Sequence, residues 1–90
     1  MVNESSVRDR LRAIVLEEAP VKPEVLTGST RLVADCGFDS LEMMQLVSIL
    51  EAAFALPRIS DAEAVTVETL DDAEELVVRA LSVPRHPPSR

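Results

Sequence analysis

Apolar residues recur along this chain at the spacing of an α-helix, in segments that are separated by prolines. In the first segment they stand three to four positions apart, at Val7, Leu11, Ile14 and Val15. Pro20 follows, and proline cannot continue a helix because it lacks an amide hydrogen and clashes with the preceding turn. The spacing therefore predicts a first helix that begins near residue 5 or 6 and ends before Pro20, with Ser6 and Asp9 placed like a capping box.

A second helix is predicted to begin after Asp39, because Asp is a good N-cap residue and Glu42 stands at the capping-box position. The helix should run to about residue 54 or 55, and Pro57 should stop it. Its core-facing stripe is predicted to be Leu46, Val47, Leu50 and Phe54.

The remaining sequence predicts one short helix and one longer helix. Ser60 can cap a single helical turn, and Thr69 can cap a last helix with Asp72 at its third position. The apolar stripe of this last helix is Leu70, Ala73, Leu76, Val77, Ala80 and Leu81. Pro84 should end it. Residues 65–68 alternate like a strand, but we expect a loop there because no second strand is available to pair with them.

These segments together predict an all-α fold, a four-helix bundle with three longer helices and one short third helix. The chain has 90 residues, which is enough for one domain, and only two glycines, which favours helices over a turn-rich β fold. We expect the domain to span residues 1–83 and the proline-rich tail, residues 84–90, to be disordered. The long connection over residues 20–39 should be pinned to the core by Leu26, Leu32, Val33 and Phe38.

The composition excludes several classes of protein. The single cysteine, Cys36, cannot form an internal disulfide, and with the single histidine, His86, it cannot supply the ligands of a structural zinc site. We therefore expect no metal. A Ser-His-Asp or Cys-His catalytic unit would have to use His86, which lies in the tail where no positioned base is expected. No apolar run is long enough to span a membrane and no signal peptide is visible at the N-terminus, so we expect a cytoplasmic protein.

Negative charge is concentrated in the second half of the chain. The net charge is −7, and the segment over residues 35–75 holds eleven acidic residues against one basic residue, Arg58. This charge repels phosphate backbones and therefore disfavours nucleic-acid binding. It would attract basic surfaces on partner proteins, although an acidic surface can also simply keep a small domain in solution.

The sequence Gly37-Phe38-Asp39-Ser40-Leu41 places a serine in the first turn of the second helix, directly after a long loop. The hydroxyl of Ser40 should be exposed there, close to unpaired backbone amides and to the positive end of the helix dipole. Nothing in the chain can activate it as a nucleophile. Ser40 is therefore either part of a helix start or a substrate for another enzyme.

From about residue 7 to residue 81, the chain resembles the acyl carrier protein family. The resemblance is carried by the Gly-x-Asp-Ser-Leu motif at residues 37–41, by Leu32 and Asp35 upstream of it, and by the order of the later helices. It implies a helical carrier that is not an enzyme. It also implies that a transferase attaches 4′-phosphopantetheine from coenzyme A to Ser40, with Asp39 assisting the transferase and its metal ion. Cargo would then be held by the thiol of this arm, and Cys36 is interpreted as a partly buried loop residue.

The resemblance also implies that the second helix is recognised by partner enzymes. Met44, Ser48 and Glu51 are on or near the face of Ser40, and together with Glu42 they are the residues expected to contact partners. Expected partners are the phosphopantetheinyl transferase and acyltransferase, adenylating or ketosynthase enzymes with basic docking surfaces, and the carrier itself should be a monomer. Gln45 and Ala52 stand where fatty-acid carriers commonly have acidic residues, which favours a specialised polyketide, aminoacyl or hybrid pathway over fatty acid synthesis.

Two other functions remain possible from the residues alone. One is an acidic helical interaction module in which Ser40 is only part of a helix cap. The other is a small hydrolase that uses Ser40, which the missing base disfavours. The cargo itself is left open, because acyl, malonyl, aminoacyl and peptidyl groups can all be carried on the same thiol.

Overall fold

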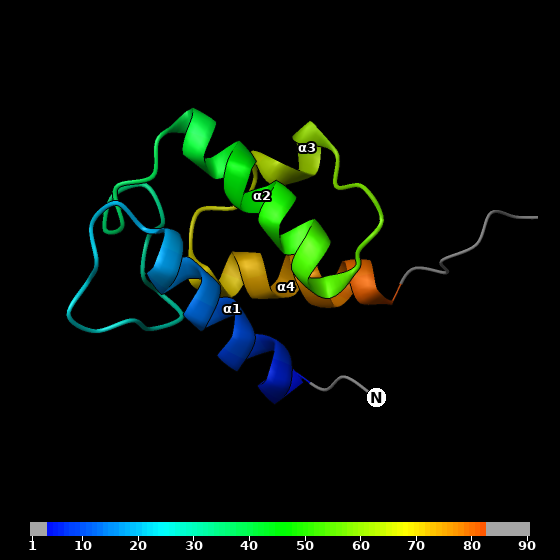
Figure 1. Cartoon of the computed structure of the whole chain (residues 1–90), viewed down its shortest axis with the longest axis horizontal. Helices are drawn as coiled ribbons and strands as arrows, with labels where there is room; N and C mark the ends of the chain where they lie inside the picture. The colour runs from blue at the N-terminus through cyan, green and yellow to red at the C-terminus, as the bar shows by residue number, and fades with distance from the viewer. Residues whose placement is uncertain (1–3, 83–90) are drawn as a thin grey trace, which may run out of the picture.

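Four helices make up the regular structure of residues 4–82, which are the residues that this computed structural model describes (Figure 1). They are α1 over Glu4–Glu18, α2 over Ser40–Phe54, α3 over Asp61–Ala64 and α4 over Leu70–Leu81. Within this part of the chain there is no strand, and Arg31 and Thr69 form an isolated β-bridge. The predicted all-α bundle with a short third helix is confirmed, and the predicted tail of residues 84–90 lies outside the described residues.

Helices α2, α3 and α4 each begin with a complete capping box. In each box the side chain of the N-cap residue accepts a hydrogen bond from the backbone amide of the residue three positions later. The side chain of that later residue in turn accepts a hydrogen bond from the backbone amide of the N-cap residue. The three pairs are Asp39 with Glu42, Ser60 with Glu63, and Thr69 with Asp72. The first helix begins within one or two residues of the predicted start, but the predicted cap at Ser6 is wrong, because α1 is already helical at Glu4 and Ser6 lies inside it.

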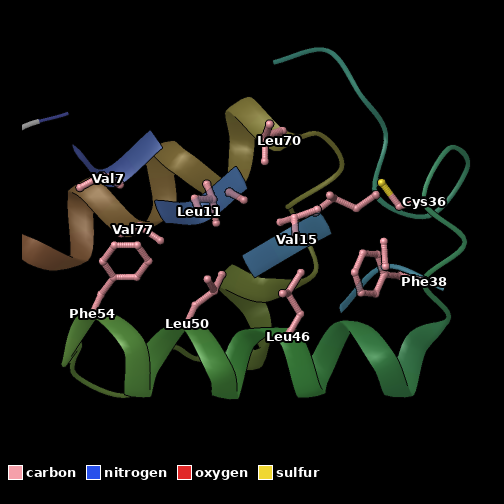
Figure 2. Packing of buried hydrophobic residues seen from close by; sticks show 13 residues of the cluster. Val7, Leu11, Val15, Cys36, Phe38, Leu46, Leu50, Phe54, Leu70 and Val77 are labelled. Carbon is pink, nitrogen blue, oxygen red and sulfur yellow. The ribbon is translucent and has the colours of Figure 1, made fainter. Parts of the chain in front are cut away.

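The core lies where α1, α2 and α4 meet (Figure 2). From α2, Leu46, Leu50 and Phe54 point towards the other two helices and are at most 9% exposed. The side chains that they meet are Val7, Leu11 and Val15 of α1 and Leu70, Ala73 and Val77 of α4. Val47 was expected in this stripe, but it is half-buried and lies on the side of α2 that faces α3.

The long connection between α1 and α2 is held to the core by buried side chains, which include Leu32, Cys36 and Phe38. Its backbone is also tied to the start of α4, where Leu32 N–H donates to the Glu68 carbonyl at 2.9 Å. Gly37 has a φ of 78°, a left-handed conformation that favours glycine, and it lets the chain turn before Phe38. The expectation that Val33 pins this loop is wrong, because Val33 is 57% exposed.

Two cations stabilise α1. The Arg8 guanidinium pairs with both carboxylate oxygens of Glu74 on α4, at 3.0 and 3.2 Å, and Glu74 is otherwise buried. At the other end of α1, Lys22 Nζ donates to the carbonyl oxygens of Leu16 and Ala19, at 2.7 and 3.1 Å. This ammonium group satisfies carbonyls that have no partner within the helix.

The packing of α2 predicts the stability effect of one substitution. Leu50→Ala should lower the free energy of unfolding by about 2–5 kcal/mol, because it leaves a cavity in a core where Leu50 is 2% exposed. Leu41→Ala makes the same change on the same helix at a residue that is 63% exposed, and should cost less than about 0.5 kcal/mol. Denaturant unfolding measures both values, and a loss below about 1 kcal/mol for Leu50→Ala would show that this packing is wrong.

The capping box of α4 predicts a dependence of stability on pH. The Asp72 carboxylate accepts the amide hydrogens of Glu68 and Thr69, at 3.0 and 3.1 Å, and these hydrogen bonds lower the pKa of Asp72. Because the pKa of Asp72 is lower in the folded protein than in the unfolded chain, its ionised carboxylate stabilises the fold at pH values above the unfolded pKa of about 3.9. This stabilisation is lost as the pH falls through the pKa of Asp72 in the folded protein. Asp72→Asn should therefore destabilise the domain at pH 7, and its difference from wild type should shrink below about pH 4.

The matched control for this prediction is Thr69→Ala, which removes the other half of the same box but no titrating group. Its cost should change much less with pH. Unfolding curves measured from pH 7 to pH 2 would contradict the prediction if the Asp72→Asn difference stayed constant.

Candidate functional site

Ser40 is the first residue of α2 and is exposed. It is placed there by the residues directly before it: the turn at Gly37, the buried ring of Phe38 and the cap at Asp39. The cap is formed by Asp39, whose Oδ1 accepts the Glu42 amide hydrogen at 2.7 Å. The hydroxyl of Ser40 takes no part in this cap and makes no hydrogen bond with residues 4–82, so it is open to an approaching molecule.

The backbone around Ser40 favours negative charge. The first backbone hydrogen bond of α2 runs from the Met43 amide to the Asp39 carbonyl at 2.8 Å. The Glu42 amide instead donates to the side-chain carboxylate of Asp39. The amides of Ser40 and Leu41 precede these bonds and are among the donors that a helix leaves without internal partners. Together with the helix dipole they favour an anion such as a phosphodiester at this position, and the carboxylate of Asp39 opposes it.

An apolar groove of about 480 Å³ begins beside Ser40, between α2 and α3. Its side chains come from the end of the long loop, from α2 and from the segment after α3. They are Val33, Phe38, Asp39, Ser40, Met43, Met44, Val47, Ala64, Val65 and Val67. Several of these are well exposed, with Met44 at 58% and Val65 at 79%, so apolar surface beside Ser40 is accessible from solvent.

A second, more polar part of the groove continues along α2 and shares Met44, Val47 and Ala64 with the first. It has a volume of about 460 Å³. Its other side chains are Ser48, Glu51, Leu56, Arg58, Ile59 and Asp61. Here the carboxylate of Glu51 accepts the Ile59 amide hydrogen at 2.6 Å and ties the loop after α2 to the helix.

The residues predicted to contact partners lie in two different places. Met44, Ser48 and Glu51 line the groove, with Met44 and Ser48 exposed and Glu51 half-buried. Glu42 lines neither part of it, and its carboxylate accepts the Asp39 amide hydrogen at 3.0 Å. Met43 is half-buried and packs against the core, so the two neighbouring methionines differ in environment.

Sequence reasoning missed the residues that form the rest of the groove, chiefly Val47, Ala64 and Val65. A signal for Val47 was present, because it stands seven residues after Ser40 and so returns to the same face after about two turns of helix. No comparable signal was available for Ala64 and Val65, because they reach the groove only through the packing of α3.

Residues 4–82 contain no histidine that could activate the hydroxyl of Ser40. The chain's histidine, His86, lies outside the described residues. Cys36 is completely buried, and burial, with a smaller contribution from the charge of Asp35, raises the pKa of its thiol. Residues 4–82 contain no group of three His, Cys, Asp or Glu side chains placed to hold a metal ion, and no helix there is long and apolar enough to cross a membrane. The site therefore presents a hydroxyl to another molecule.

Residues 9–77 match the family model described as the phosphopantetheine attachment site. Among solved structures, the chain is similar to an acyl carrier protein from Thermotoga maritima, with a TM-score of 0.69 and 29% identity over 83% of this chain and 91% of that one. It is also similar to a putative acyl carrier protein from Mycobacterium tuberculosis, with a TM-score of 0.72 and 29% identity over 81% of this chain and 96% of that one.

The residues at the start of α2 fit the prosthetic group that this family carries. An exposed hydroxyl can form a phosphodiester, and the amides and helix dipole beside it favour the resulting negative charge. The match covers more than half of the chain and includes all four helices in part or in full. The chain therefore belongs to the phosphopantetheine attachment site family, whose members are carrier proteins that bear a covalently bound 4′-phosphopantetheine and are not enzymes.

Proposed function

We propose that this protein carries acyl intermediates, which include aminoacyl and polyketide groups, as thioesters on a 4′-phosphopantetheine arm attached to Ser40. The observation that carries this proposal is the exposed Ser40 hydroxyl at the start of α2, which lies beside an apolar groove and makes no hydrogen bond with residues 4–82. The two similar structures, which are an acyl carrier protein and a putative acyl carrier protein, support an acyl cargo.

The environment of Ser40 distinguishes it from other serines of the chain. The Ser60 hydroxyl belongs to the capping box of α3, and the Ser82 hydroxyl donates to the Val78 carbonyl at 3.0 Å. Ser48 is exposed but lies in the middle of α2, where the backbone amides are paired within the helix. Ser40 combines an open hydroxyl with the open amides of a helix start, which supports it as the attachment residue.

Loading of Ser40 is a substitution at phosphorus. The Ser40 Oγ forms a bond to the phosphorus that bears the pantetheine portion of coenzyme A, and the bond from this phosphorus to the bridging oxygen breaks, which releases adenosine 3′,5′-bisphosphate. The proton of the hydroxyl is proposed to pass to a base on the transferase, because residues 4–82 contain no histidine to take it. Asp39 stands beside Ser40 and is proposed to help position the transferase and its metal ion. When bound, the arm supplies the thiol that holds the cargo.

Partner enzymes are proposed to dock on the groove face of α2, where Met44, Ser48 and Glu51 lie together. An exposed methionine can adapt to different partner surfaces, and the acidic segment over residues 35–75 would attract basic ones. Glu42 is proposed as a contact at the margin of this face, since its carboxylate also serves the capping box. The partners are a phosphopantetheinyl transferase and acyltransferase, adenylating or ketosynthase enzymes with basic docking surfaces.

The alternative of an acidic interaction module rested on Ser40 being part of a helix cap. The cap is made by Asp39 and Glu42, and the Ser40 hydroxyl is not part of it. This separation leaves the exposed hydroxyl without a structural role, which favours the carrier over the module.

Incubation of the apo protein with coenzyme A, Mg²⁺ and a broad-specificity phosphopantetheinyl transferase should add the mass of one phosphopantetheine. Ser40→Ala should abolish the gain while leaving the circular dichroism spectrum unchanged, because Asp39 holds the cap. Ser48→Ala is the matched control on the same helix and should still be loaded. A wild-type protein that stays at its apo mass with several active transferases, or a modification that maps to Ser48 or Ser60, would overturn the proposal.

The buried thiol of Cys36 gives this experiment a second readout. Because burial raises its pKa and limits access, native apo protein should react slowly with a thiol reagent at pH 8. The loaded protein should gain one fast-reacting thiol, and Cys36→Ala should gain it too. Fast labelling of Cys36 in the apo protein would show that the loop is not packed as described.

If the transferase docks on α2, Met44→Ala should leave the melting temperature nearly unchanged. It should lower kcat/KM for loading by about fivefold, which corresponds to the loss of roughly 1 kcal/mol of binding free energy at the interface. The control is Val25→Ala, an exposed apolar residue in the loop between α1 and α2, which should not affect loading. Glu51→Gln keeps an oxygen for the Ile59 amide while removing a charge, so any slowing of loading by it should shrink at high salt. Unfolding of Met44→Ala with normal loading of the folded fraction would contradict this interface.

A further inference from the structure

Two adjacent methionines of α2 lie in different surroundings. Met43 is half-buried, packs against the core and lines only the apolar part of the groove. Met44 is 58% exposed and lines both parts of the groove, where the first part also contains the exposed Val65. Together with the buried Cys36, these methionines are the sulfur-containing side chains of residues 4–82. Of the three, Met44 is the one that a small solute can approach most freely.

A methionine thioether is oxidised by hydroperoxides. The sulfur forms a bond to one peroxide oxygen, the O–O bond breaks, and with hydrogen peroxide the other oxygen leaves as water. Sulfur loses two electrons and the peroxide gains them. The product is a polar sulfoxide, which methionine sulfoxide reductases return to the thioether with two thiols as the reductant. Hydrogen peroxide is uncharged, so the negative charge of residues 35–75 does not keep it away from Met44.

The thiol of Cys36 competes poorly for the same oxidant. The thiolate is the reactive form of a cysteine, and burial raises the pKa of this thiol and limits access to it. A thioether needs no deprotonation before it reacts. Oxidation of the apo protein should therefore start at Met44.

An oxygen on the sulfur of Met44 has different consequences for the free domain and for a complex. In the free domain the exposed side chain keeps the oxygen in contact with water, so the fold loses little stability. Under a docked partner the oxygen is removed from water, and the neighbouring side chains of Val47 and Val65 offer it no hydrogen-bond donor. A polar atom that is buried without a partner costs free energy. The same oxygen on Met43 would instead disturb the core.

We propose that Met44 is a modification site, at which oxidation to the sulfoxide by hydroperoxides reversibly blocks docking of the transferase on α2. The inference rests on the proposed function, which places partner docking on the groove face of this helix. It adds that the apo carrier is loaded while Met44 is reduced, is not loaded efficiently after oxidation, and recovers when the thioether is restored. Met43, one residue away, has no part in this switch.

The test oxidises the apo protein with hydrogen peroxide and then measures loading after the peroxide has been removed. Apo protein is used because the arm would add a second oxidisable sulfur. The tryptic peptide over residues 32–58 contains Cys36, Met43 and Met44, and its fragment spectra show which sulfur has gained oxygen. The wild type is compared with the matched variants Met44→Leu and Met43→Leu, each against its own unoxidised sample. Melting temperature and kcat/KM for loading are measured on every sample.

Met44 should gain oxygen at least about threefold faster than Met43, because oxidation follows exposure. Oxidation of Met44 should lower kcat/KM for loading by about fivefold or more, in the wild type and in Met43→Leu, while the melting temperature stays nearly unchanged. The two methionine sulfoxide reductases, one for each sulfoxide epimer, should restore loading when dithiothreitol is the reductant. Oxidised Met44→Leu should be loaded as fast as its unoxidised sample.

Four results would overturn the proposal. They are oxidation of Met43 as fast as that of Met44, unchanged loading after Met44 is oxidised, an equal loss of loading in Met44→Leu, and a loss of loading that follows a fall in melting temperature. A failure to load the unoxidised wild type would instead refute the attachment at Ser40, and the switch would fall with it.

Discussion

The start of α2 is fixed by one reciprocal pair of hydrogen bonds, and the arrangement of the site depends on it. The Asp39 carboxylate accepts the Glu42 amide hydrogen, and the Glu42 carboxylate accepts that of Asp39. This pair changes the chain from loop to helix between two consecutive residues. Ser40 is thereby left at the first helical position, with its hydroxyl free of the cap and with open amides beside it. The same two acidic side chains also give this end of the helix its negative charge.

Helix α2 serves two layers of the molecule at once. Leu46, Leu50 and Phe54 pack into the core with α1 and α4, while Met44 and Val47 form the floor of the groove towards α3. A helix that is apolar on one stripe alone could form the core but would have no apolar surface left for the groove. Met44 and Val47 are thus explained by the groove on the α3 side of the helix, and they are separate from the residues of α2 that form the core.

The fold could be predicted from the sequence because its signals are local. The apolar residues of a helix recur every three to four positions, and the two residues of each capping box stand three positions apart. The motif around Ser40 overlaps one of these boxes. What the sequence could not show depends on contacts between distant segments. Periodicity places Val47 beside Leu46 but does not say which edge of a wide apolar stripe is covered. The hydrogen bond from Ile59 to Glu51 and the position of Arg58 at the groove both depend on the path of the loop after α2, which no short pattern encodes.

The lysine content of the chain has a consequence for the chemistry of a thioester carrier. A thioester can be lost by transfer of its acyl group to a neutral amine, and a lysine of the carrier itself is one such amine. This chain has one lysine, Lys22, and its ammonium donates to the backbone carbonyls at the end of α1. While this nitrogen is protonated and donates to these carbonyls, it has no lone pair with which to attack a thioester. On the proposed function, Lys22 in this arrangement would leave the cargo intact until a partner enzyme takes it.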